Sequence, residues 1–195
     1  MIRIFIVIQL VCAAFLLATC ERSNMYDLAK YGLPPQSAIY LFAIGQQPGN
    51  FGGRKNADDM CYRQGIAYHT VVKASTVKAF ISFSVIDEMR FLVPAQYWYY
   101  PVIGISPAMV FTTISNSWLD LWNGTPLIAG VNTSVGIATT WWSGSNNDGS
   151  VTVNDTCSEW QKSDTTTGRI GDAVVSSLSA SPACSSLQYV LCITY

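Results

Sequence analysis

Cysteines are the residues of this sequence whose type and spacing point most clearly to chemistry. Six are present, and four of them, Cys61, Cys157, Cys184 and Cys192, lie well beyond the N-terminal region. An even number of such cysteines in an exported chain favours two disulfides. Four cysteines allow three pairings, and their positions alone do not choose among them. The sequence contains no Cys-x-x-Cys pair, so neither a zinc knuckle nor a thioredoxin-type site is indicated.

The N-terminus has the features of a secretory signal. Arg3 supplies a positive charge, residues 4–17 are apolar except for Gln9, and small residues follow before Cys20. The apolar run is short for a membrane-spanning helix. We therefore expect a signal peptide over residues 1–19.

Cys20 closes the stretch Leu-Ala-Thr-Cys, which resembles a bacterial lipobox. In that motif the cysteine is acylated and becomes the mature N-terminus. Thr19 departs from the usual Gly or Ala. The resemblance implies an exported protein that is anchored by lipid at Cys20, since several acyl chains hold a protein firmly at a bilayer. The residues after Cys20 leave inner versus outer membrane open, and we expect the outer membrane or cell surface. The alternative is ordinary cleavage nearby and a soluble secreted product.

The rest of the chain indicates one domain. The chain has 195 residues, of which 50% are apolar and 12% charged, enough for one sizeable core. Residues 20–36 contain the pair Pro34-Pro35 and predict a tether, which leaves residues 37–195 for the domain. The net charge of −1 gives no reason to expect nucleic acid as a partner.

The first half of the domain shows strand and helix patterns. Residues 38–45 (AIYLFAIG) form an apolar run of strand length. Asn56 is a plausible N-cap for a helix that carries Met60 and Cys61 inward and ends at Gly65.

A second strand and a second helix are expected after this. Alternation from Val77 through Ala79, Ile81 and Phe83 predicts a strand. Ser84 and Asp87 resemble a capping box for a helix that buries four apolar residues, namely Val85, Ile86, Met89 and Leu92. The second half is rich in Ser, Thr, Gly and short β-prone runs, so the predicted class is α+β.

Six blocks in order resemble a known family. They are Gly53–Cys61, Lys78–Ser82, Ser117–Gly124, Trp142–Ser145, Thr156–Trp160 with Thr167–Gly171, and Cys184–Ile193. Over about residues 37–195 they resemble endostatin, and more closely the leptospiral endostatin-like outer-membrane lipoproteins. The resemblance implies a C-type-lectin-like fold with two helices, a mixed, mainly antiparallel sheet, long loops and two nested disulfides, Cys61–Cys192 and Cys157–Cys184.

Calcium, zinc and catalytic signatures are missing from the sequence. The positions that align with the calcium-binding Trp-Asn-Asp of C-type lectins are residues 179–181, Ser-Ala-Ser, which argues against calcium-dependent sugar binding. Asn146–Gly149 overlaps an EF-hand loop only partly and predicts a turn.

The single histidine, His69, gives no metal site, and we expect no cofactor. No Gly-x-Ser-x-Gly, phosphate loop or His-Glu-x-x-His occurs, so we expect a binding protein and not an enzyme.

Two groups of residues are candidates for partner binding. The first is the aromatic run Tyr97, Trp98, Tyr99 and Tyr100, because Tyr and Trp concentrate binding energy at interfaces. The alternative is that two of these rings face the core and two pack on a neighbouring loop. The second group is basic and comprises Arg54, Lys55 and Arg63, with ordinary surface scatter as the alternative. Trp118, Leu121, Trp122, Trp141 and Trp142 are expected in the core.

The resemblance also implies partners. It predicts binding of host matrix proteins such as laminin and fibronectin, or of plasma proteins such as complement factor H and plasminogen. Two other hypotheses stay open: an envelope or periplasmic structural role, and calcium-independent glycan binding.

Overall fold

The computed structural model describes residues 37–68, 76–175 and 181–195. The expected signal peptide, the lipid site Cys20, the tether and His69 lie outside these residues. From Ser37 to Tyr195 the chain forms one compact unit. Within the described ranges, no helix has the length and apolar character needed to cross a membrane.

Short strands, one long helix and several single helical turns make up the unit. The strands are β1 (Ile39–Gln47), β2 (Lys78–Ala79), β3 (Val102–Ile105), β4 (Phe111–Ser115), β5 (Trp141–Trp142), β6 (Ile170–Gly171) and β7 (Gln188–Thr194); the α-helices are α3 (Arg54–Tyr68), α4 (Val131–Ser134) and α5 (Cys157–Trp160); and 3-10 turns cover Met89–Phe91, Ala95–Tyr97 and Leu119–Leu121. This confirms the predicted α+β class.

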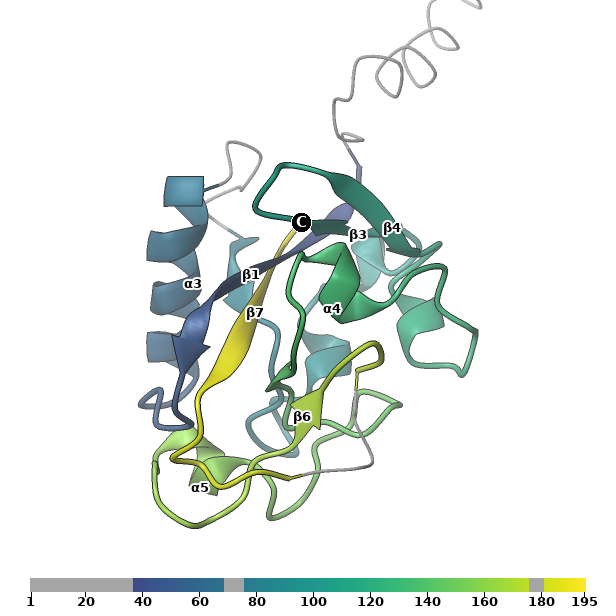
Figure 1. Cartoon of the computed structure of the whole chain (residues 1–195). Coiled ribbons are helices and arrows are strands. Elements are labelled where there is room, and N and C mark those ends of the chain that lie inside the picture. The colour runs from purple at the N-terminus through teal and green to yellow at the C-terminus, as the bar shows by residue number, and fades with distance from the viewer. Residues whose placement is uncertain (1–36, 69–75, 176–180) are drawn as a thin grey trace, which may run out of the picture. The chain divides into compact units, whose positions relative to one another are not determined.

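The strands form a mixed sheet in the order β4-β3-β1-β7-β5-β6, with β2 also paired to β7. The first and last strands lie side by side at its centre, antiparallel, with Phe42 opposite Cys192 (Figure 1). The pairs β2–β7, β3–β4 and β5–β6 are antiparallel as well, whereas β1–β3 and β5–β7 are parallel. The expected mixed, mainly antiparallel sheet is therefore confirmed.

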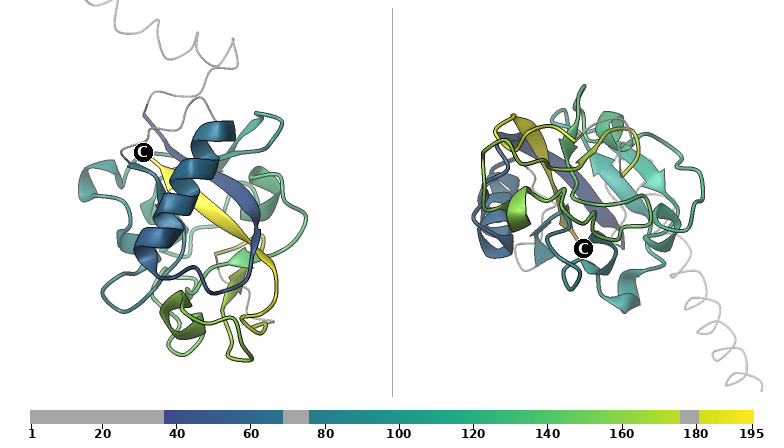
Figure 2. Two further views of the ribbon diagram at one scale, coloured as in Figure 1. Left: turned by 90° about the vertical axis from the view of Figure 1, so that its left-hand side faces the viewer. Right: turned by 90° about the horizontal axis from the view of Figure 1, so that it is seen from below.

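Both faces of the central strands are buried. Tyr40, Phe42 and Ile44 of β1 belong to one hydrophobic cluster, whereas Ile39 and Leu41 belong to a second one. The helix α3 crosses the β1–β7 pair on the side of the first cluster (Figure 2). Burial on both faces explains why the sequence of β1 is a continuous apolar run and not an alternating one.

Helix α3 is longer than the sequence predicted at both ends. It begins at Arg54, so Asn56 is not its N-cap and instead donates from Nδ2 to the carbonyl of Gly52 at 3.2 Å. It continues through Gly65, which is buried inside the helix. Cys61 is fully buried as expected, whereas Met60 is only half-buried.

The predicted second helix over residues 84–92 is wrong. Ser84 and Asp87 close a turn in which the Asp87 amide donates to the Ser84 carbonyl at 2.9 Å. Val85 and Ile86, expected in the core, are 70% and 93% exposed. Only Met89 and Leu92 are buried as expected.

The segment before this turn is strand-like only at its start. Val77, Ala79, Ile81 and Phe83 are buried as the alternation predicted, but Phe80 between them is fully buried as well. The regular strand covers only the two residues of β2, although the Phe80 amide still donates to the Leu191 carbonyl of β7 at 2.8 Å.

The two disulfides join Cys61 to Cys192 and Cys157 to Cys184, each with Cα atoms 5.6 Å apart. The second lies within the sequence span of the first, so the nested pairing implied by the resemblance is confirmed. The first bond ties α3 to β7, and the second closes a loop in the half of the unit with the fewest regular elements.

Tryptophans fill the core largely as expected. Trp118, Trp141 and Trp142 are fully buried, and each donates its indole N–H to a backbone carbonyl. Trp122 packs against the second cluster but stays partly exposed, and its indole nitrogen has no hydrogen-bond partner.

Candidate functional site

Arg54, a candidate for partner binding, lies in an intramolecular network. Its Nε and Nη2 donate to the two carboxylate oxygens of Asp87 at 2.8 and 2.9 Å. Its Nη1 donates to the carbonyl of Ala79, and Nη2 also donates to that of Ile81. The guanidinium lies 4.2 Å from the centre of the Phe83 ring. The Arg54 side chain is 22% exposed, and its nitrogen donors form hydrogen bonds within the protein.

This network braces the Ser84–Asp87 turn. The turn is closed by the hydrogen bond from the Asp87 amide to Ser84 and by one from the Phe83 amide to the Asp87 carbonyl, both 2.9 Å. Its two central residues, Val85 and Ile86, project into solvent, and we call this pair the aliphatic tip. Central turn positions usually carry Gly, Asn, Asp, Ser or Pro. Two β-branched residues on a rigid turn therefore form an unusual feature of the surface.

A groove of about 500 Å³ begins at the aliphatic tip. Val153 lies along it and is 70% exposed. The residues that line this tip groove are Phe83, Ser84, Val85, Val151, Thr152, Val153, Asn154, Thr156, Ser158, Glu159 and Thr166. Glu159 is the only charged residue among them. The tip groove thus combines aliphatic side chains with hydroxyl groups and one carboxylate.

One wall of the tip groove is a single turn of left-handed backbone. Cys157, Ser158, Glu159 and Trp160 all have φ between 50° and 60°. For residues other than glycine this conformation costs on the order of 1–2 kcal/mol each. The Cys157–Cys184 disulfide holds one end, and at the other end Trp160 donates its indole N–H to the Ser82 carbonyl at 2.8 Å. Strain of this kind persists where surrounding contacts fix it, and it clusters at functional sites.

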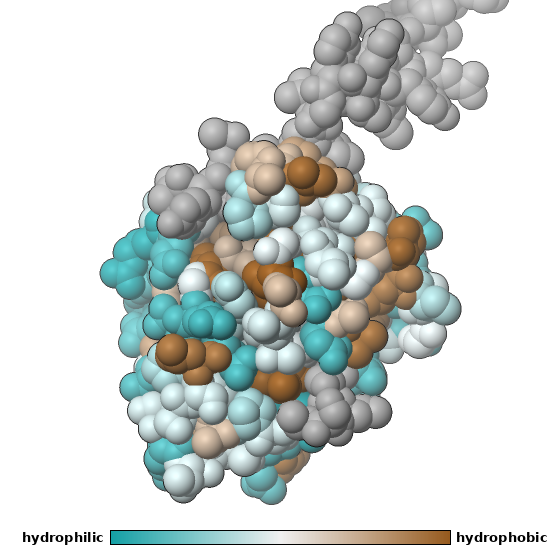
Figure 3. All heavy atoms as spheres, in the orientation of Figure 1, coloured by the Kyte–Doolittle hydropathy of each residue, from teal (hydrophilic) through white to brown (hydrophobic). Residues whose placement is uncertain are grey.

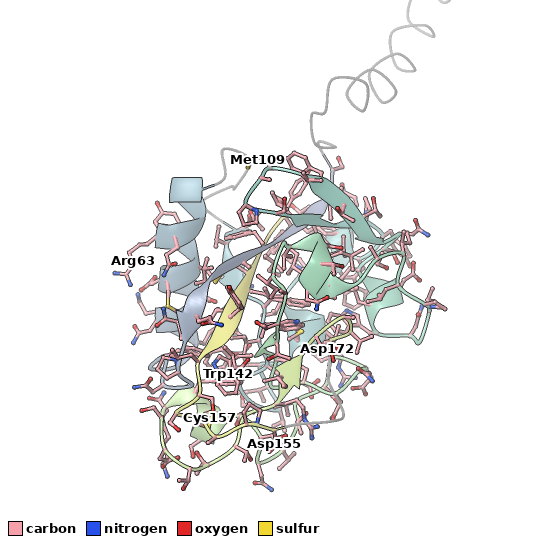
Figure 4. The ribbon with its side chains drawn as sticks, viewed as in Figure 1. Arg63, Met109, Trp142, Asp155, Cys157 and Asp172 are labelled. Atoms are coloured by element: carbon pink, nitrogen blue, oxygen red, sulfur yellow. A yellow bond between two sulfur atoms is a disulfide. The ribbon has the colours of Figure 1, made fainter. Side chains whose placement is uncertain are left out.

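The lower part of Figure 4 shows Cys157 of this turn close to the Trp142 side chain. α5 resembles an ordinary helical turn only in its hydrogen bonds. For example, the Trp160 amide donates to the Thr156 carbonyl. The sequence gives no signal for a left-handed turn here, because none of its four residues is Gly or Asn.

The other two basic candidates are exposed on α3. Lys55 pairs with Asp59, one turn along the helix. Arg63 extends away from the body of the unit (Figure 4), and its Nε donates to the Asp59 carbonyl at 3.3 Å. Lys55 and Arg63 are therefore accessible, but the structure does not join them with Arg54 in one basic surface.

The aromatic run is mostly packed. Tyr97 contacts the rings of Tyr100 and Tyr195, with centroids 5.4 and 5.1 Å apart. Trp98 is half-buried and donates its indole N–H to the Val93 carbonyl at 2.9 Å. Only Tyr99 projects freely, with 78% exposure. Three of the four rings pack against the second hydrophobic cluster, so the run does not present four exposed rings side by side.

The Asn146–Gly149 stretch is the turn that was predicted. The Asn146 amide donates to the Ser150 carbonyl at 2.8 Å across the turn. Asp155, the last position of the partial calcium-loop pattern, accepts instead from Arg169 Nη2 at 2.9 Å and from the Thr167 hydroxyl at 2.6 Å. In the part of the chain that the structure describes, no three His, Cys, Asp or Glu side chains gather as a metal ion would require.

Apolar side chains on the face drawn in Figure 3 occur as small separate groups among polar ones. The aliphatic tip was missed at the sequence level because Val85 and Ile86 fit the spacing of a buried helical face. Their position between a capping Ser and Asp gave no sign of exposure. The bracing residue, Arg54, lies 33 positions from Asp87, which local patterns do not reveal.

Comparison with known proteins gave no relatives. No protein-family model matches the chain, and a search of curated proteins found no match.

Proposed function

We propose that this chain is an exported, lipid-anchored member of the endostatin-like group, with a C-type-lectin-like fold, that binds extracellular proteins. Support for the family comes from the six ordered sequence blocks. The two disulfide pairings and the mixed, mainly antiparallel sheet agree with what the resemblance implies. The proposed partners are host matrix proteins or plasma proteins, and Cys20 is the proposed membrane anchor.

The aliphatic tip is the observation that carries the binding role. Ile86 is 93% exposed and Val85 is 70% exposed, on a turn that Arg54 holds in place. Burying a Val or Ile side chain stabilises a complex by roughly 1.5–3 kcal/mol. Because the turn is already ordered, little conformational entropy is lost when a partner covers it.

The tip groove defines the chemistry of the partner segment. Its aliphatic residues favour an apolar side chain, and Glu159 favours an adjacent Lys or Arg. The hydroxyl and amide side chains of the groove can hydrogen-bond an extended backbone. We therefore propose a protein segment in which an apolar residue stands next to a basic one.

The test is binding of the purified full-length chain, with both disulfides formed, to laminin, fibronectin, factor H and plasminogen. The double variant Val85→Ser with Ile86→Ser should weaken binding at least about tenfold, as expected for loss of two buried aliphatic groups. The matched control is Val110→Ser, an exposed valine (57%) outside the tip groove. Equal weakening in both variants, or none in the tip variant, would contradict a role for the tip.

The salt dependence of binding, together with charge-removing variants, distinguishes binding through the aliphatic tip from binding through the basic residues. If Lys55 and Arg63 carried the interaction, binding would fall steeply with ionic strength, and Lys55→Gln with Arg63→Gln would abolish it. We expect weak salt dependence and a small effect of this pair. Absence of binding across the panel by a folded chain would favour the envelope role. Proteolysis of intact cells tests that role directly, because a periplasmic protein is spared.

A further inference from the structure

A second hollow, separate from the tip groove, has the features of a small-molecule site. It measures about 330 Å³ and is lined by Arg90, Phe91, Trp98, Leu119, Trp122, Asn123 and Asp148. We call it the Phe91 pocket. It shares no lining residue with the tip groove. Three aromatic rings with a few polar groups are the usual composition of a site for a small ligand.

A spare donor and a spare acceptor face each other in this pocket. Arg90 Nη1 and Asp148 Oδ2 lie 3.8 Å apart, which is too far for a hydrogen bond between them. The Nε and Nη2 of Arg90 are held by Glu88, at 2.8 and 2.7 Å. Asp148 Oδ1 accepts from the amide and the hydroxyl of Ser150. One hydroxyl group placed between Nη1 and Oδ2 could accept from the first and donate to the second.

Apolar surface adjoins this pair. The Phe91 ring is 60% exposed, and the Arg90 guanidinium lies 4.9 Å from its centre. Trp98 is fixed by its indole hydrogen bond to Val93. The C–H face of a sugar ring can pack on an exposed aromatic ring while its hydroxyls reach polar neighbours.

Backbone contacts hold the walls of the pocket together. The Trp118 indole donates to the Arg90 carbonyl at 2.9 Å, and the Arg90 amide donates to the Gly149 carbonyl at 3.3 Å. Gly149 has φ +74°, and a Cβ there would lie 2.6 Å from Trp122 Cε3 and 2.8 Å from the Arg90 Cβ. Only glycine therefore lets the turn approach both walls so closely.

The local charge selects among saccharides. Arg90 is outweighed by the carboxylates of Glu88 and Asp148, so the cluster carries one net negative charge. The Asp148 carboxylate is an acceptor at neutral pH, and the Ser150 hydroxyl lowers its pKa further, so it stays ionised into more acidic solution. A sulfated or acidic sugar would be repelled, whereas a neutral sugar would not.

We infer that the Phe91 pocket binds a neutral saccharide without a metal ion. One sugar hydroxyl bridges Arg90 Nη1 and Asp148 Oδ2, and an apolar face of the ring lies on Phe91. This inference does not depend on the proposed protein-binding role, because it uses other residues.

The experiment titrates the full-length, oxidised chain, with and without EDTA, with glucose, galactose, mannose, N-acetylglucosamine and lactose, using ligand-observed NMR and calorimetry. Sialyllactose and a heparin oligosaccharide serve as anionic probes. We expect saturable binding of at least one neutral sugar. Asp148→Asn, which keeps an oxygen acceptor for Ser150, should weaken it about tenfold, since a hydrogen bond to a charged group contributes about 1.5 kcal/mol or more. Phe91→Ala should weaken it by a similar factor, because it removes the apolar surface on which the sugar ring packs.

Tyr62→Ala is the control, because Tyr62 is an exposed aromatic residue (41%) on α3 and outside the pocket. It should leave the affinity unchanged. The inference is overturned if no neutral sugar binds to the folded chain or if the anionic probes bind more tightly. It is equally overturned if EDTA abolishes binding or if the pocket variants bind as well as the unmodified chain.

Discussion

The guanidinium of Arg54 meets the carboxylate of Asp87 through two hydrogen bonds of 2.8 and 2.9 Å. This contact links the first residue of α3 to the last residue of the turn that carries Val85 and Ile86. Two-point contacts of Arg with a carboxylate fix orientation as well as distance. The direction in which the aliphatic tip projects is therefore set by a residue 33 positions earlier in the sequence.

We expect a double-mutant cycle of Arg54→Met and Asp87→Asn to give a coupling energy of about 1–2 kcal/mol, because the pair is partly shielded and bidentate. The control is the Lys55–Asp59 pair on the same helix, with side chains 85% and 50% exposed. Its coupling should be below about 0.5 kcal/mol. Urea unfolding of the seven proteins, with the unmodified chain shared by both cycles, measures both energies, and equal couplings would contradict the bracing role of Arg54.

The left-handed backbone of α5 predicts that substitution by glycine there stabilises the fold, whereas glycine inside an ordinary helix destabilises it. Ser158 and Glu159 have φ of 55° and are exposed. Glycine adopts this conformation without steric cost, so Ser158→Gly and Glu159→Gly should each raise the free energy of unfolding by about 0.5–1 kcal/mol. Gln161→Gly, two residues on at φ −102°, should lower it by a similar amount. Thermal unfolding distinguishes the signs, and destabilisation by all three changes would refute the strain argument.

The two disulfides should differ in their contribution to stability. In the chain-entropy model a bond that spans 131 residues contributes about 5 kcal/mol, and one that spans 27 residues contributes about 3.5 kcal/mol. Paired Cys→Ser variants at Cys61 with Cys192, and at Cys157 with Cys184, test this by denaturant unfolding. The first pair should be the more destabilised. The reverse order would mean that the Cys157–Cys184 bond stabilises the fold more by holding the left-handed turn than the Cys61–Cys192 bond does by closing its longer loop.

Acid should weaken the fold partly through Asp148. The Ser150 hydroxyl lowers the pKa of this carboxyl, with the Ser150 amide as the next cause. Because the folded pKa lies below the unfolded value of about 3.9, ionised Asp148 stabilises the fold above about pH 4. This stabilisation is lost as the pH falls through the folded pKa. Ser150→Ala should therefore raise the pKa of Asp148, measured by carboxyl NMR titration.

Thr166→Ala is the matched control for that titration. Asp164 accepts from the Thr166 amide and hydroxyl in the same arrangement, which lowers the pKa of Asp164. The control should raise the pKa of Asp164 and leave that of Asp148 in place. If Ser150→Ala left the Asp148 titration unchanged, the hydroxyl would not be the main cause of the shift.

Local sequence patterns predicted the elements in which the spacing of apolar residues matches the positions that are buried. The run at 38–45 became β1 because both of its faces are covered, and the helix around Cys61 formed because its buried positions recur at helical spacing. Helix ends were less predictable. Asn56 is a good N-cap by type, yet the helix starts two residues earlier, at Arg54.

Features that depend on distant contacts were not predictable in this way. Asp87 fits a capping box, but its carboxylate pairs with Arg54 and the helix does not form. Tyr97 was a candidate for partner binding, but it packs on Tyr195, which is remote in the sequence. Neither outcome follows from the residues that flank Asp87 or Tyr97.

The central position of β7, the last strand of the chain, affects when the sheet can form during synthesis. Residues 188–194 hydrogen-bond to β1, β2 and β5, yet they are synthesised after every other element of the sheet. A growing chain that stops before residue 188 has neither the centre of the sheet nor the partner of Cys61. The pairing of β7 with β1, β2 and β5, and the Cys61–Cys192 bond, are therefore deferred until synthesis is nearly finished, and loop closure over such separations is slow. A chain with this topology is therefore expected to complete its sheet only after its last strand has been made.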